Sequence, residues 1–128
     1  MNHGRFFLLA GALSGFFTVA FGAFAAHGLR HQIPAEMLLV FNKGVQYQGL
    51  HALALLGVGI MAAQRSSKAL TIAGWSILLG TLLFSGSLYL LALTGISPLG
   101  IITPFGGLSF LIGWLSLTIA GWNYSSDP

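Results

Sequence analysis

Long apolar runs make up most of this chain, and its few charged residues lie at the ends of those runs. No Asp, Glu, Lys or Arg occurs between Phe6 and Leu29, and none occurs between Ala69 and Ser126. About 20 helical residues cross the hydrocarbon core of a bilayer, so apolar runs of this length are typical of membrane spans. The pattern predicts four spanning helices, over about residues 6–26, 47–63, 69–93 and 104–122.

One stretch between the first two runs mixes polar and apolar residues. Pro34 is suited to the first turn of a helix. After it, apolar side chains are interleaved with Asn42, Lys43 and Gln46. This pattern predicts an amphipathic interfacial helix over about residues 34–46 that leads into the second span. We therefore expect an all-α fold, an integral membrane four-helix bundle with this additional helix, and a single membrane domain over residues 1–128.

Composition supports the membrane assignment and excludes several other classes. Charged residues make up 5% of the chain, whereas soluble domains have about a quarter. The net charge of +3 comes from single basic residues at the edges of the runs, without the clustered basic face of a nucleic-acid binder. The chain has no cysteine, which excludes disulfides, thiolate catalysis and cysteine-ligated metal sites. The expected partners are the lipid bilayer and other membrane subunits or further copies of this chain, with no nucleic acid.

The N-terminal run has two interpretations. Arg5, the apolar run that follows it and the small residues at 23–25 resemble a signal peptide with its cleavage site. We interpret the run as a retained first span. An even number of spans places both termini on one side with the turn at 65–68. That side would carry Arg5, Arg65 and Lys68 against Arg30 and Lys43 on the other, so the positive-inside rule predicts cytoplasmic termini.

Polar side chains that could carry chemistry gather around the second span. Lys43, Tyr47 and His51 are spaced four residues apart and share one helical face. His51 begins a deep apolar run, where an ionisable group is costly and is expected to have a partner. His27 and the polar residues of the third span are the expected partners. The candidate set for a polar cluster or ligand contact is His27, Arg30, Lys43, Tyr47, Gln48, His51, Ser85, Ser87 and Tyr89.

His51 itself has three interpretations: a neutral histidine in an interhelical hydrogen bond, a contact to a ligand or substrate, or a proton carrier. A metal site would need His27 and His31 together with His51. Gly28 interrupts that spacing, and Glu36 is the only internal carboxylate because Asp127 lies near the end of the chain. We therefore expect neither a metal nor a cofactor.

Catalytic motifs are missing as well. The sequence Ser-Gly-Ser at 85–87 lacks the flanking glycines of a nucleophile elbow, and a Ser–His–Asp triad would have no third member. We therefore expect that the protein is not an enzyme.

Four ordered motifs carry a resemblance to one family. They are FGAFAAHGL at 21–29, YQ and HALALL between 47 and 56, LFSGSLY at 83–89, and TPFGG with GW between 103 and 114. The chain resembles the small inner-membrane proteins catalogued as domain of unknown function 423, whose animal relatives are labelled only as transmembrane proteins. Ala25 stands where the family pattern has glycine, and Ile101 where it has proline. The resemblance implies a four-helix membrane protein and implies no reaction.

Two functions remain as hypotheses. The first is a non-enzymatic accessory or scaffold subunit of a larger membrane assembly, favoured by the shortage of charge and the many small residues available for helix contacts. The second is a binding or transport module for a lipid, a quinone or a small solute, in a cavity near His51.

Overall fold

The computed structural model describes residues 2–124, and Asp127 lies outside this range. Helix α1 spans His3–Phe24 and continues through a π-helical turn at Ala25–Leu29. Helix α2 spans Ala35–Gln64. Helix α3, Lys68–Gly80, continues through a second π-helical turn, Thr81–Ser85, into α4, Gly86–Thr94. A 3-10 turn at Ser97–Ile101 precedes α5, Thr103–Trp122.

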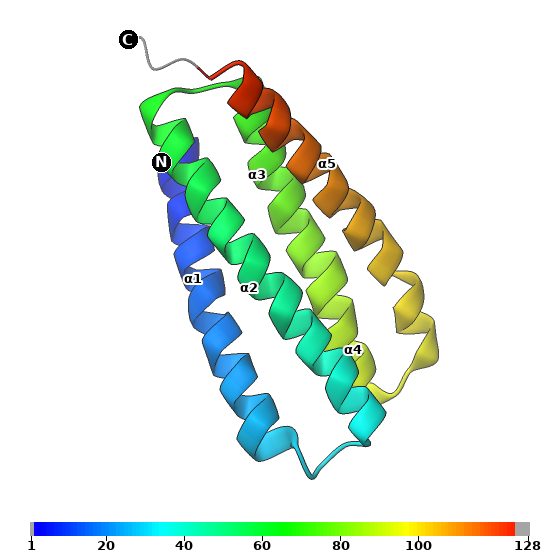
Figure 1. Cartoon of the computed structure of the whole chain (residues 1–128). Helices are drawn as coiled ribbons and strands as arrows, with labels where there is room; N and C mark the ends of the chain where they lie inside the picture. Colours follow the sequence, from blue (N-terminus) through cyan, green and yellow to red (C-terminus); the bar gives the residue numbers. More distant parts are fainter. Residues whose placement is uncertain (1, 125–128) are drawn as a thin grey trace.

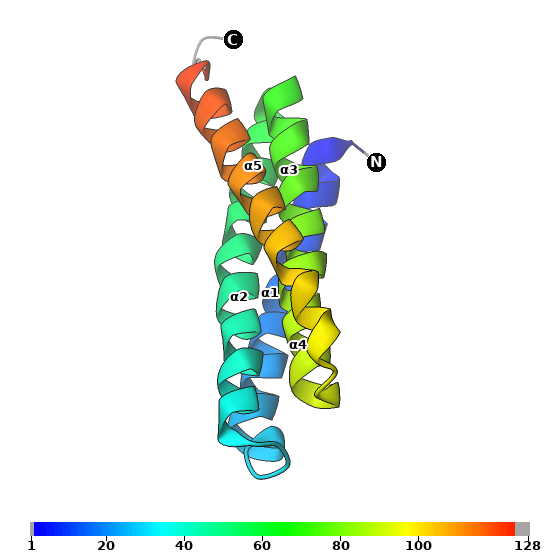
Figure 2. The ribbon, with the colours of Figure 1, turned by 90° about the vertical axis from the view of Figure 1, so that its right-hand side faces the viewer.

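These elements form four rods that alternate in direction along one long axis (Figures 1 and 2). Each rod is long and apolar enough to cross a membrane: His3–Leu29, Ala35–Gln64, Lys68–Thr94 and Ser97–Trp122. The predicted all-α bundle of four membrane helices is thus confirmed. Helix α1 begins and α5 ends at the same end of the bundle, beside the α2–α3 turn (Figure 1). This arrangement is the one that an even number of spans requires.

The amphipathic segment over about residues 34–46 is not a separate helix, which corrects that part of the prediction. It forms the first turns of α2, which runs without a break from Ala35 to Gln64. Phe41 in this segment is 2% exposed and packs against Ala25, Leu29 and Ala92. The apolar face of the segment is therefore buried against α1 and α4, and this packing holds it in line with the rest of α2.

Gly44 lies where α2 comes close to the chain segment around Ser85 and Tyr89. A Cβ atom there would lie 2.7 Å from the ring of Tyr89 and 3.4 Å from the carbonyl oxygen of Ser85. The missing side chain lets α2 approach α4 closely, as small residues commonly do between membrane helices. Gly11 acts in the same way between α1 and α2, where a Cβ would lie 2.9 Å from the backbone nitrogen of Leu56.

The interior contains two apolar clusters with polar side chains between them. Near the termini the cluster consists of Phe7, Leu55, Val58, Leu70, Ala73, Ile77 and Ala120. Near the opposite end it consists of Ala25, Leu29, Phe41 and Ala92. Gln48, His51 and Ser85 are buried at the level between the two clusters. These three sequence-predicted polar residues are therefore buried in the middle of the bundle.

Candidate functional site

His51 is buried at the centre of α2, where 2% of its surface is exposed. Its Nε2 atom lies 2.9 Å from the indole Nε1 of Trp114 on α5, and its Nδ1 atom lies 2.7 Å from the carbonyl oxygen of Tyr47. An indole N–H can only donate, so Nε2 is the acceptor and the proton resides on Nδ1, which donates to the carbonyl. Both ring nitrogens are thereby used, and the imidazole is held in one neutral tautomer.

An aromatic stack fixes the plane of the same ring. The His51 ring lies on Phe110 with centroids 3.5 Å apart and an interplanar angle of 11°. Tyr47 extends the group, because its ring lies 4.6 Å from that of Phe84. His51 thus contacts α5 in two ways, by stacking on Phe110 and by accepting a hydrogen bond from Trp114.

Trp114 is the residue that the sequence reasoning missed. The histidine was expected to bond His27 or the polar residues of the third span, and this expectation is wrong, because its partner lies on the fourth span. A signal was present in the sequence. Trp114 lies too deep in its span to be an interfacial anchor, and a tryptophan N–H inside a membrane needs an acceptor.

Gln48 forms a second junction, here called the amide clamp, with Ser14 of α1 and Tyr89 of α4. Its Nε2 donates to the carbonyl oxygen and the hydroxyl of Ser14, each at 3.2 Å. Its Oε1 accepts a hydrogen bond of 2.6 Å from the Tyr89 hydroxyl. The carbonyl of Ser14 can only accept, which determines the orientation of the amide. One side chain on α2 therefore joins three helices.

Ser85 and Ser87 form two further, separate junctions. The Ser85 hydroxyl donates to the Gly44 carbonyl on α2 at 2.7 Å. The Ser87 hydroxyl lies 2.6 Å from that of Thr103 at the start of α5. The polar cluster that the sequence suggested is thus divided into several smaller hydrogen-bonded groups, each joining a different pair or triplet of helices.

Of the remaining candidate residues, three lie away from these junctions. The side chains of His27, Arg30 and Lys43 are exposed. His27 and Arg30 lie where the first rod ends, and Lys43 lies within α2. Tyr47 is 36% exposed and contributes its carbonyl rather than its hydroxyl. Within residues 2–124, no three His, Cys, Asp or Glu side chains come together as a metal site would need.

A lateral groove of about 460 Å³ opens between α1 and α3. Apolar side chains form most of its walls, and polar groups of Ser14, Gln48 and Thr81 also line it. One residue of its lining, Phe6, stacks on Trp75 with ring centroids 5.1 Å apart. His51 does not line this groove.

These features define a small α-helical integral membrane protein whose buried polar groups join its helices to one another. The chain belongs to the DUF423 family, described as a protein of unknown function, whose pattern matches residues 21–107. The matched range contains Gln48, His51, Ser85 and Tyr89 but not Ser14 or Trp114.

Curated relatives agree with this assignment. The chain is 45% identical to the UPF0382 membrane protein YwdK of Bacillus subtilis over 94% of this chain and 98% of the relative. It is 47% identical to a UPF0382 membrane protein of Haemophilus influenzae, with coverage of 90% and 92%. It is also 42% identical to the UPF0382 inner membrane protein YgdD of Escherichia coli, with coverage of 90% and 88%. No solved structure matches the chain. The protein is therefore a multi-pass membrane protein, and the side on which its termini lie stays a prediction.

Proposed function

We propose that this protein is a non-enzymatic accessory subunit of a larger membrane assembly and that it acts through its lipid-facing surface. The observation that carries the proposal is the internal pairing of its buried polar groups. Among residues 2–124, no buried side-chain nitrogen or oxygen is without a hydrogen-bond partner. The polar interior is occupied with holding the helices together, which leaves the outer surface as the part available to other molecules.

The state of His51 supports the non-enzymatic part of the proposal. A general acid or base must reach a substrate proton directly or through one water. Both nitrogens of His51 are already bonded, to Tyr47 and Trp114. Protonation of Nε2 would turn a donor toward the indole N–H and break the bond to α5. The histidine is therefore better suited to fixing helix packing than to moving protons or binding a solute.

The lateral groove supplies a specific surface for a partner. In lipid, helices associate by van der Waals packing, and a concave apolar surface offers more of it than a flat one. Leu9, Leu13 and Leu82 line the groove and are more than half exposed. Side chains from a membrane helix of another subunit would fill the hollow and cover these leucines.

One observation favours the alternative, a binding module for a lipid, a quinone or another small apolar molecule. The groove volume of about 460 Å³ lies within the range of about 300–1,000 Å³ of small-molecule pockets. Its polar groups are already paired within the chain, since Gln48 bonds Ser14 and Tyr89. A ligand there would find apolar contact and little hydrogen bonding, which is why we place this function second.

Gentle detergent extraction followed by native mass spectrometry distinguishes the two functions. Leu13→Trp places an indole at the groove, and Leu53→Trp is the matched control on α2, away from it. The two leucines are similarly exposed, at 59% and 68%. We expect stoichiometric co-purification of other membrane subunits with the wild type and with Leu53→Trp, and loss of these subunits from Leu13→Trp. Recovery of the chain alone with a stoichiometric small molecule would overturn the proposal.

A further inference from the structure

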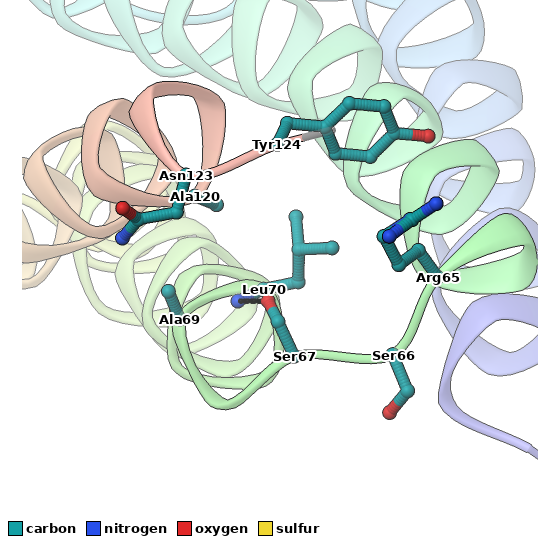
Figure 3. A pocket seen from close by; sticks show the side chains of 8 residues that line it. All are labelled: Arg65, Ser66, Ser67, Ala69, Leu70, Ala120, Asn123 and Tyr124. Carbon is teal, nitrogen blue, oxygen red and sulfur yellow. Dashed lines mark hydrogen bonds between the residues drawn. The ribbon is translucent and has the colours of Figure 1, made fainter. Parts of the chain in front are cut away.

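A pocket of about 240 Å³ lies at the end of the bundle that carries the termini (Figure 3). The α2–α3 turn contributes Arg65, Ser66 and Ser67 to it. Asn123 and Tyr124, which follow α5, line it from the other side. Two segments 60 residues apart in sequence are held together here, because the Tyr124 hydroxyl donates to the Oε1 atom of Gln64 at 2.8 Å. The pocket is therefore formed by the packing of these two segments against each other.

The lining of this pocket divides into a polar rim and an apolar floor. Arg65 and Asn123 lie on opposite sides of the opening, with Leu70 between them (Figure 3). Leu70 is 1% exposed and Ala120 is 5% exposed, so the floor is part of the apolar core. A ligand that fits both parts must carry an anionic or strongly accepting group and, next to it, an apolar one.

Among residues 2–124, the charged side chains at this end of the bundle are all basic. Arg5, Arg65 and Lys68 lie at the ends of helices that meet here. Within residues 2–124 the one carboxylate is Glu36, in the first turn of α2 at the opposite end. The side chains around the pocket therefore attract anions, and no carboxylate of the described range neutralises them.

The attraction comes from these side chains and not from the start of α3. Ser67 already caps that helix, since its hydroxyl accepts from the backbone N–H of Leu70 at 3.1 Å. Its carbonyl accepts from the N–H of Thr71 at the same distance. Arg65 brings a guanidinium to the pocket, and a guanidinium can hold two phosphate oxygens at once.

We propose that this pocket binds the phosphate headgroup of an anionic phospholipid. Basic residues next to the ends of membrane helices lie at the level of the headgroups, and basic pockets between such helices bind acidic lipids. Arg65 contacts the phosphodiester, Asn123 and the serine hydroxyls contact the remaining oxygens or the headgroup, and Leu70 with Ala120 contacts the glycerol and the first methylenes. This inference does not depend on the proposed accessory role.

The test is a native mass spectrometry titration of the delipidated protein in a neutral detergent, with phosphatidylglycerol and with phosphatidylcholine as probes. The wild type should bind one phosphatidylglycerol in preference to phosphatidylcholine. Arg65→Gln should weaken that binding about tenfold, the loss expected for one hydrogen-bonded charge. Arg30→Gln is the matched control, an exposed arginine at the other end of the bundle, and should bind as the wild type does. Circular dichroism verifies that each variant is folded.

Asn123→Leu provides a second variant that leaves Arg65 in place. Asn123 is exposed, so the substitution spares the core while it removes the polar side of the rim. It should also weaken phosphatidylglycerol binding. Equal binding of the two lipids, or equal losses in Arg65→Gln and Arg30→Gln, would overturn the proposal. Full competition by millimolar sodium phosphate would overturn the lipid assignment, because the ligand would then be soluble phosphate.

Discussion

Removal of the indole N–H from Trp114 tests the central interpretation of His51. In Trp114→Phe the ring remains aromatic, but Nε2 of His51 loses the donor at 2.9 Å. Hydrogen bonds between membrane helices are worth about 0.6 kcal/mol on average and at most about 1.7 kcal/mol. A buried acceptor left without a partner costs about 1–3 kcal/mol. Because His51 is 2% exposed, no lipid or water group replaces the donor, and the expected destabilisation is about 1.5–3 kcal/mol.

Reversible unfolding by dodecyl sulfate in mixed micelles, followed by circular dichroism, measures this change. Trp122→Phe is the matched control, since Trp122 is 89% exposed and belongs to the same helix. It should change the free energy of unfolding by less than about 0.5 kcal/mol, as exposed substitutions usually do.

A double-mutant cycle with His51→Phe isolates the hydrogen bond from the change in shape. Phenylalanine keeps a ring stacked on Phe110. The free-energy cost of replacing imidazole by a larger ring is present both in His51→Phe and in the double variant, so it cancels in the coupling energy. The double variant should therefore be more stable than the sum of the two single losses predicts. A coupling energy near zero, or a loss in Trp114→Phe no larger than that in Trp122→Phe, would refute the assignment of His51 as a structural bridge.

Three further predictions concern close helix packing, the amide clamp and the membrane topology. Gly106→Ala should destabilise the bundle by about 1–3 kcal/mol, because the added Cβ would meet the backbone of the π-helical turn between α3 and α4. Gly121→Ala, with open space around it, should be neutral or stabilising. The same unfolding assay compares the two variants. Tyr89→Phe leaves the buried Oε1 of Gln48 without its donor and should lower the free energy of unfolding by about 1–3 kcal/mol. An unchanged value would indicate that this hydrogen bond is not formed in the membrane. Because the chain has no cysteine, Asn2→Cys and Ser66→Cys can each be labelled as single-cysteine variants in cells. Both cysteines should react with a reagent on the cytoplasmic side. Labelling from opposite sides of the membrane would contradict the even number of spans.

The sequence by itself determined the number and approximate extent of the spans. A run without charges can lie in lipid only as a helix, because each backbone N–H and C=O must bond within its own segment. That condition is local and depends on composition alone. The third span illustrates it, since the predicted range of about 69–93 and the observed Lys68–Thr94 nearly coincide. The pairing of termini at one end follows from the even count in the same way.

The tertiary structure decided which polar groups meet. A hydrogen bond between two helices requires a particular rotation and axial position of each, and these depend on how closely glycines such as Gly44 let the backbones approach. His51 and Trp114 are 63 residues apart, and no periodicity in either segment relates one to the other. The secondary structure of residues 34–46 also depends on tertiary packing. Their amphipathic pattern fits an interfacial helix, but burial of Phe41 against α1 and α4 makes them the first turns of α2. The run of apolar residues therefore specifies where the helices are, and only their mutual packing specifies what the polar residues between them do.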